Sequence, residues 1–286
     1  MNRYFRQIVF TRHQYQFLDF MKIAIDLMGG EGCGEQNLEG CLAYPYAEEL
    51  IVIGDIVRLD QQKINVLVER GAQLRSCAAA LTGNETPRAL LKRSHDTSLA
   101  IGMQMLADKK ADALVSSADT KAMMTLGRSF LGTVAGLYRP AIAKAFQGPC
   151  GQFYMLDLGA NVHCAPDLLR QFGRLGSALQ STHQLPAASV TENIGAGHLM
   201  PPRVGLLNIG VERGKGTGDI NRAISLFEQD DCINCIGFIE PSELFSGRAD
   251  VIVCDGYTGN LVLKTIESMA RFLRDQLASL ANETHY

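Results

Sequence analysis

Short apolar runs alternate with amphipathic segments along nearly the whole chain. The runs are rich in Val, Ile and Leu, and the segments between them repeat apolar residues at the spacing of a helix. This repeated order of strand and helix predicts a mostly parallel sheet with helices on both faces, which is a three-layer αβα fold. Strands are predicted at residues 22–26, 50–53, 65–68, 113–115, 141–146, 153–156 and 204–207, around Ile236, and at 251–254.

Helix signals fill the intervals between these strands. One helix is predicted after Gly30, disturbed near Pro45, and another begins at Thr86 with Pro87 in its first turn. The remaining predicted helices span 98–108, begin at Thr120, follow Pro166, end near Glu228, and run from the last strand to about Ala281.

No Ser/Pro-rich linker or internal repeat interrupts this alternation, so residues 21–286 are predicted to form a single α/β domain. Residues 1–20 mix aromatic and basic side chains without the continuous apolar core of a signal peptide, and we treat them as an N-terminal extension. The segment 181–202, rich in Ser, Thr, Gly and Pro, is the one long predicted loop.

Polar residues and glycines follow most of the predicted strands. In open α/β sheets, ligands bind outside the carboxyl ends of the strands, so these residues are expected to meet at one edge. Taken singly, the Asn and Asp residues have a local explanation as turn or N-cap residues. The candidate binding residues are Asp26, Gly29, Gly30, Ser117, Asp119, Thr120, Gly159, Asn161, Asn208, Gly210, Gly214, Lys215, Asp255, Thr258, Gly259 and Asn260.

The stretch 203–216, RVGLLNIGVERGKG, is the most suggestive of these loops. A buried strand leads into spaced glycines and Lys215, a combination that suits an anion because glycines let the backbone approach a ligand closely. The loop is not a P-loop, since Gly210 and Gly214 are one residue too close and Gly216 stands where Ser or Thr is needed. The alternative is a solvated loop lysine.

A dinucleotide site is a weaker alternative. Gly30 and Gly32 match the first two glycines of GxGxxG, but Glu35 occupies the third position, so an NAD-dependent dehydrogenase is disfavoured. There is no GxSxG elbow, and no His stands in a recognisable triad context.

Composition excludes several classes of function. The 27 basic and 30 acidic residues give no argument for nucleic-acid binding. No apolar run reaches the roughly 18 residues of a membrane span. The eight cysteines are scattered beside apolar residues, which favours free thiols and a cytosolic location. Cys232 and Cys235 form a CxxC without a second pair or a nearby His, so neither a metal nor any other cofactor is expected.

Four long motifs, taken in order, resemble the PlsX family of phosphate acyltransferases: residues 21–30, 157–177, 203–216 and 249–267. The resemblance implies an isocitrate/isopropylmalate dehydrogenase-like fold and a homodimer that is cytosolic, with peripheral membrane association at most. It also implies transfer of a fatty acyl group from acyl-[acyl carrier protein] to inorganic phosphate, giving acyl phosphate for phospholipid synthesis.

Elementary chemistry is compatible with that reaction. Phosphate carries its own nucleophilic oxygen, so the protein has to hold it against a thioester and stabilise the oxyanion. We assign catalytic roles to Lys215 as the neutralising charge and to Asn161 or Asn208 as oxyanion donors. One such donor contributes about 2.7–4 kcal/mol, so loss of Asn208 would lower turnover about a hundredfold if it has that role.

The sequence also departs from the family pattern. Glu31 follows Gly30 where the family has Asp, and the loop 116–122 reads SSADTKA where the family has SAGNTGA. Asp119 there would repel phosphate unless a cation such as Lys121 answers it. The chain stops at Tyr286, where the family continues.

These departures keep a second hypothesis open, a noncatalytic protein that binds acyl carrier protein or acyl chains. Arg88, Lys92 and Arg93 are candidates for contacting an acidic carrier protein, the alternative being an ordinary solvated helix face.

Overall fold

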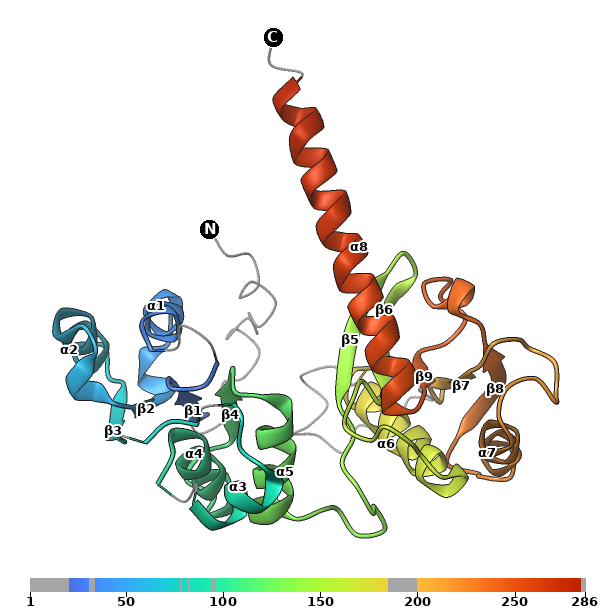
Figure 1. Ribbon diagram of the computed structural model, residues 1–286, viewed down its shortest axis with the longest axis horizontal. Coiled ribbons are helices and arrows are strands. Elements are labelled where there is room, and N and C mark those ends of the chain that lie inside the picture. Colours follow the sequence, from blue (N-terminus) through green and yellow to red (C-terminus); the bar gives the residue numbers. More distant parts are fainter. Residues whose placement is uncertain are drawn as a thin grey trace. The chain divides into compact units, whose positions relative to one another are not determined.

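The computed structural model describes residues 21–30, 34–77, 79–81, 83–93, 96–184 and 200–283 (Figure 1). The chain divides into two compact units, Met1–Thr133 and Val134–Tyr286, and each unit is built around its own sheet. The sequence predicted a single α/β domain over 21–286. The alternation of strand and helix runs straight through the boundary, and no change in composition marks it.

The sheet of the first unit has four parallel strands in the order β3-β2-β1-β4. Asp26, the last residue of β1, is in register with Ser116, the last residue of β4. The carboxyl ends of these neighbouring strands therefore lie side by side. The strands are β1 (Ile23–Asp26), β2 (Leu50–Gly54), β3 (Gln73–Ser76) and β4 (Ala113–Ser116).

Helices cover both faces of this sheet (Figure 1). On one face, Leu38 and Leu67 pack with Val52 in one buried cluster. On the other face, Met105 packs with Ala24 and Ile51. The first face carries α1 (Glu35–Ala43) and α2 (Gln61–Glu69), and the second carries α4 (Ser98–Ala107), against which α5 (Thr120–Leu131) packs, with α3 (Pro87–Arg93) beside α5.

One predicted strand in this unit was wrong, and one edge strand was missed. Residues 65–68 belong to α2, which Asp60 caps by accepting the backbone N–H groups of Gln62 and Lys63, and its buried residues Ile64 and Leu67 have helical spacing. The third strand is instead Gln73–Ser76, an edge strand whose side chains are mostly exposed. It therefore lacks the apolar run that marks a buried strand.

The sheet of the second unit has the order β5-β6-β9-β7-β8. The first two strands form an antiparallel hairpin, and the other pairings are parallel, so the sheet is mostly parallel as predicted. The strands are β5 (Ala143–Gly148), β6 (Gly151–Leu156), β7 (Arg203–Leu207), β8 (Asn234–Ile239) and β9 (Val251–Val253).

Helices again cover both faces. Phe172 of α6 (Pro166–Gln184) and Phe227 of α7 (Gly218–Glu228) are fully buried against one face. On the other face, the start of α8 (Gly256–Glu283) packs beside Met155 and Ile252. Each unit is thus a three-layer αβα arrangement, which confirms the predicted fold class.

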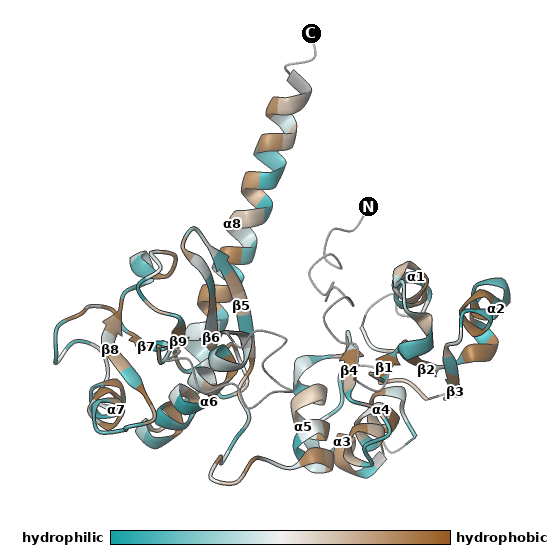
Figure 2. Cartoon of the chain, turned by 180° about the vertical axis from the view of Figure 1, so that it is seen from behind, coloured by the Kyte–Doolittle hydropathy of each residue, from teal (hydrophilic) through white to brown (hydrophobic). Residues whose placement is uncertain are grey.

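The remainder of α8 continues past the sheet (Figure 1). In Figure 2, hydrophobic segments alternate with hydrophilic ones along this helix. No helix in the described ranges is both long and apolar enough to span a membrane. The large exposed apolar residues of α8 are Tyr257, Leu261, Met269, Phe272, Leu273, Leu277 and Leu280.

Candidate functional site

The carboxyl ends of β6, β9 and β7 form one edge of the second sheet. Because these strands are parallel neighbours, the loops that follow them emerge together. The loop after β6 carries Asn161, Asp255 follows β9, and Asn208 begins the loop that contains Lys215. The backbone N–H of Gly256 donates to the carbonyl of Asn161 at 2.8 Å, which ties two of these loops directly.

The Asn208 side chain hydrogen-bonds two backbone carbonyls of the Lys215 loop and so keeps the loop closed. Its buried side-chain amide donates to the carbonyl of Gly210 at 3.0 Å and to that of Lys215 at 3.1 Å. Gly216 lies so close that a Cβ there would be 2.2 Å from the Asn208 Oδ1. Both N–H groups of this amide therefore serve the loop in this structure. Its role as an oxyanion donor remains a prediction.

Asn221 of α7 holds the same loop from the other side. Its Nδ2 donates to the carbonyl of Lys215 at 2.9 Å, and its Oδ1 accepts the N–H of Gly214 at 2.8 Å. Thr217 caps α7 by accepting the N–H of Ile220. The sequence analysis missed Asn221, because a helical Asn several residues past a loop gives no sign of folding back onto it.

Lys215 presents its ammonium at the surface of this loop. The Nζ lies 2.7 Å from the Oε2 of Glu212, and both side chains are more than half exposed. The hydrogen bond to Glu212 raises the pKa of Lys215, with further contributions from the charges of Glu212 and Glu240. The same hydrogen bond lowers the pKa of Glu212. The loop therefore carries a fixed positive charge, already paired with a carboxylate.

Asp157 and Asn161 form a buried hub in the loop after β6. The Asp157 carboxylate accepts the backbone N–H groups of Ile142 and Ala160, both at 3.0 Å, and the Asn161 amide at 2.8 Å. The Asn161 amide also donates to the carbonyl of Pro140 at 2.9 Å. Both of its N–H groups are thus engaged within the protein, and its oxyanion role also remains a prediction.

This hub fixes the segment 138–142, of which the sequence analysis assigned only residues 141 and 142, to the predicted strand 141–146. Residues 138–142 are bonded at Pro140 and Ile142 to the hub, and the Tyr138 N–H donates to Gln171 of α6 at 2.9 Å. Arg139 lies within this segment and is exposed. Burial raises the pKa of Cys164 to about 12, Asp157 adds to the rise, and the charge of Arg139 opposes it. Arg139 is therefore a second cation near the carboxyl edge.

The N-terminus of α8 packs tightly onto the hub. A Cβ on Gly259 would lie 1.9 Å from the Asp157 carbonyl oxygen, and one on Gly256 would lie 2.6 Å from that of Asn161. The Asp255 carboxylate accepts the N–H of Thr258 at 2.7 Å, as an N-cap residue does. Close packing and capping account for these residues locally. A ligand role for Asp255, Thr258, Gly259, Asn260 and Gly159 remains a prediction.

In the first unit, the ends of β1 and β4 are joined by polar contacts. The Asp26 carboxylate, 1% exposed, accepts the N–H of Met28 at 2.9 Å and the Ser116 hydroxyl at 2.7 Å. Ser117 donates from its hydroxyl to the Gly29 carbonyl at 2.6 Å. A Cβ on Gly29 would lie 2.6 Å from the Ala118 nitrogen, so this close approach needs glycine.

Two neighbouring residues complete this loop pair. Asn37 of α1 donates to the carbonyl of Leu27 at 3.1 Å and to the Ser117 hydroxyl at 3.2 Å. Asp119 caps α5 by accepting the N–H groups of Lys121 and Ala122. The carboxylate that departs from the family pattern therefore has a structural use. Gly30 also packs on Ser117, and the exposed Thr120 begins α5.

Comparison with known proteins identifies the family. A family model described as fatty acid synthesis protein matches residues 21–284. The phosphate acyltransferase of Pseudomonas savastanoi pv. phaseolicola is 34% identical over 270 residues, which are 91% of this chain and 74% of that protein. That of Halothermothrix orenii is 34% identical over 269 residues, 92% of this chain and 76% of that protein. The chain belongs to the PlsX family of phosphate acyltransferases. It is thus a member of a transferase family, as the four motifs predicted.

Two solved structures show a similar fold. The EutD phosphotransacetylase of Staphylococcus aureus aligns with a TM-score of 0.53 at 17% identity, covering 87% of this chain and 82% of that one. A branched-chain phosphotransacylase of Enterococcus faecalis V583 aligns with a TM-score of 0.54 at 14% identity, covering 86% of this chain and 84% of that one. At these identities the likeness concerns the fold alone.

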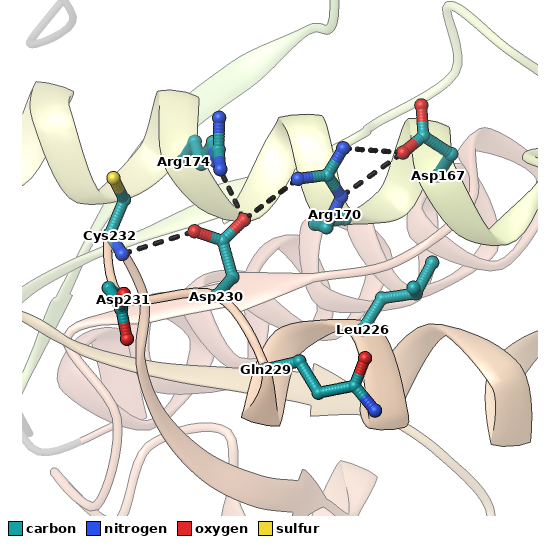
Figure 3. Close-up of a pocket in the computed structure, with 8 residues that line it drawn as sticks. All are labelled: Asp167, Arg170, Arg174, Leu226, Gln229, Asp230, Asp231 and Cys232. Carbon is teal, nitrogen blue, oxygen red and sulfur yellow. Dashed lines mark hydrogen bonds and ion pairs between the residues drawn. The ribbon is translucent and has the colours of Figure 1, made fainter.

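A pocket lies before β8, at the opposite edge of the second sheet (Figure 3). Most of the charged residues that line it form ion pairs with one another. Asp230, whose side chain is 2% exposed, accepts Arg174 at 2.6 Å and Arg170 at 3.1 Å. It also accepts the N–H of Cys232. The described residues contain no group of three or more His, Cys, Asp or Glu able to hold a metal.

Proposed function

We propose that this protein transfers a fatty acyl group from acyl-[acyl carrier protein] to inorganic phosphate, forming acyl phosphate for phospholipid synthesis. Membership in the phosphate acyltransferase family supports the reaction type. The observation that carries the proposal is the Lys215 loop. It is a closed loop at the carboxyl end of β7, fixed by two asparagine side chains and presenting an exposed ammonium.

In the proposed reaction, a phosphate oxygen forms a bond to the thioester carbonyl carbon. The carbon–sulfur bond then breaks, and the carrier protein leaves as a thiolate that takes up a proton. Phosphate supplies the nucleophile, so the protein contributes position and charge. Lys215 attracts the phosphate, and Arg139 provides further positive charge near the same edge.

The remaining candidate residues have two kinds of proposed role. Asn161 and Asn208 fix the segments that carry Arg139 and Lys215, and to act as oxyanion donors each would have to release a backbone carbonyl. Substrate contacts in the first unit are proposed for Asp26, Gly29, Gly30, Ser117, Asp119 and Thr120. Substrate contacts in the second unit are proposed for Gly159, Gly210, Gly214, Asp255, Thr258, Gly259 and Asn260.

A direct assay tests this proposal. Purified protein is incubated with long-chain acyl-[acyl carrier protein] and phosphate, and acyl phosphate is measured after trapping with hydroxylamine. We expect product whose formation depends on both substrates. Absence of product, with carrier protein still retained in a pull-down, would replace the proposal by its alternative.

That alternative is a noncatalytic protein that binds acyl carrier protein or acyl chains. It is favoured by the loop 116–122, where Asp119 and Lys121 stand in place of the family's Asn and Gly. The Asp119 carboxylate caps α5, so this change is compatible with a stable loop whether or not the loop binds phosphate.

The proposal includes the carrier protein as an acidic partner. Arg88 and Lys92 are exposed on α3 and remain candidates for the contact, together with Arg93. Replacing Arg88 and Lys92 by Glu is expected to weaken carrier binding and flatten its dependence on salt. Unchanged binding would exclude this helix.

We also propose that two copies of the chain associate, as the family resemblance implies, and that the protein works in the cytosol. The exposed apolar side of α8 supports association, because apolar patches of this kind mark protein contacts. Cysteines 41, 77, 150, 164, 232, 235 and 254 are free, which suits a reducing compartment.

A further inference from the structure

Glu212 forms an ion pair with Lys215 inside the loop that follows β7. The two side chains are three residues apart, and the backbone N–H of Lys215 donates to the Glu212 carbonyl at 3.3 Å, which closes a turn. The turn brings the Lys215 Nζ to 2.7 Å from the Glu212 Oε2. The ammonium is therefore already bound to an oxyanion that the protein itself supplies.

Gly210 provides the surface across which this ion pair lies. A Cβ on Gly210 would be 2.3 Å from the Lys215 Cδ, 2.9 Å from the Glu212 Oε2 and 3.0 Å from the Lys215 Nζ. The pair thus rests directly on the Gly210 backbone. A glycine at this position is explained by the pair and needs no bound ligand to account for it.

The backbone beneath the pair is fixed, so the lysine side chain is the part free to move. The Lys215 carbonyl accepts one hydrogen bond from Asn208 and one from Asn221. Both side chains of the pair are more than half exposed, and exposed ion pairs are weak. Breaking this ion pair would therefore leave the two hydrogen bonds that hold the loop backbone in place.

We propose that Glu212 sets the phosphate affinity of the Lys215 site by competing with phosphate for the ammonium and repelling it. This inference rests on the proposed function and deepens it. While Glu212 holds Lys215 across Gly210, the site is closed to anions. Phosphate binds by displacing the carboxylate, and Glu240, whose charge also acts on Lys215, adds to the repulsion.

The test compares Glu212→Gln with a matched control, Glu228→Gln. Gln keeps the size and hydrogen-bonding capacity of Glu but removes the charge. Glu228 is also an exposed carboxylate paired to a cation of the same loop, Arg213, at 2.6 Å. The dissociation constant for inorganic phosphate is measured by equilibrium dialysis, and the KM values for phosphate and acyl-[acyl carrier protein] are measured separately.

We expect Glu212→Gln to bind phosphate about fivefold more tightly than the wild type, with the KM for phosphate falling in parallel. The KM for acyl-[acyl carrier protein] stays unchanged, and Glu228→Gln behaves as wild type. Phosphate affinity in Glu212→Gln that is equal to or weaker than that of the wild type overturns the inference. An equal gain in Glu228→Gln also overturns it, because the effect would then be one of net charge.

The two proposals fail in different ways. If the wild type makes acyl phosphate and Glu212→Gln binds phosphate no more tightly, the competition is absent while the function stands. If neither protein binds phosphate and neither makes product, the function and the inference fall together. Phosphate binding in Glu212→Gln at concentrations where the wild type shows none would be the strongest support.

Discussion

At the scale of single residues, Asp157 is the polar group around which the loop after β6 is organised. It is fully buried, and both carboxylate oxygens accept hydrogen bonds. Asn161 belongs to the same hub, and its amide links the Asp157 carboxylate to the Pro140 carbonyl. These contacts fix the backbone on both sides of Arg139, so the hub would act on the proposed site through the segment 138–142 without touching a substrate.

The first prediction concerns the hub formed by Asp157 and Asn161. Asn161→Ala removes the amide that joins Asp157 to Pro140. The buried Asp157 carboxylate then has one hydrogen bond fewer, and the partly buried Pro140 carbonyl loses this donor. Each unsatisfied buried group costs about 1–3 kcal/mol. We expect a loss in the free energy of unfolding of about that size, measured by urea denaturation. Asn65→Ala, at an exposed position of α2, is the control and should change stability by less than about 0.5 kcal/mol. Equal losses of stability in Asn161→Ala and Asn65→Ala would contradict a stabilising role for the hub.

Sequence reasoning placed Asn161, Asn208 and Asp255 at strand ends correctly but could not say what their side chains bond. An asparagine at a strand end is equally suited to a ligand and to a loop carbonyl. Which of these two roles the asparagine has depends on the carbonyls that lie within its reach in the closed loop, and this is a property of the folded backbone. The same reason explains why Asn221 escaped notice, because its bonds to Gly214 and Lys215 exist only once the loop folds back onto α7.

At the scale of elements, the turn between α7 and β8 is clamped to α6. Burial works against ionisation of Asp230, but hydrogen bonds from Arg174, the Cys232 N–H and Arg170 outweigh it and lower its pKa. The clamp joins the end of α7 to α6, and both helices pack on the same face of the second sheet. It lies at the amino end of β8, away from the proposed site.

The clamp predicts a pH dependence. Because the folded pKa of Asp230 is lowered, its stabilisation is present above the ordinary pKa of about 3.9 and is lost as the pH falls through the folded value. Asp230→Asn should reduce the free energy of unfolding at pH 7 by about 1–3 kcal/mol. The difference from wild type should shrink as the pH is lowered below about 4.

Urea denaturation at several pH values measures this difference. Asp231→Asn, a change at the exposed neighbouring position, serves as the control. Its free energy of unfolding should fall little at any of these pH values. A loss in Asp230→Asn that stays constant from pH 7 to pH 3 would show that the charge of Asp230 does not carry the stabilisation.

Most elements were predictable because apolar runs mark the buried strands. The exceptions follow the same rule. The edge strand Gln73–Ser76 has little apolar surface to bury, and residues 65–68 of α2 present an apolar run that resembles a strand when read without the Asp60 cap. The predicted loop 181–202 overlaps the end of α6, which extends to Gln184, and residues 185–199 lie outside the described residues.

At the scale of the whole molecule, the sequence concealed the division into two units. No change in composition marks the boundary at Thr133 and Val134, and strands and helices alternate on both sides of it. The predicted binding residues are consequently shared between two separate sheets, six of them in the first unit and the others in the second.

Association of two copies is tested on α8. Replacing Leu273 and Leu277 by Glu places charge on its exposed apolar side. If two copies associate through this side, the variant should have half the mass of the wild type by light scattering. Val57→Glu, at an exposed apolar position of the first unit, should leave the mass unchanged. A wild type that is already monomeric would contradict the association.

The central claim is that the Lys215 ammonium serves phosphate-dependent acyl transfer. The most direct measurement is the rate of acyl phosphate formation by wild type and Lys215→Met, with Arg213→Met, which removes another exposed cation of the same loop, as the control. We predict that Lys215→Met lowers kcat/KM for phosphate about a hundredfold or more, while Arg213→Met retains most of it. Equal rates for wild type and Lys215→Met would contradict the account.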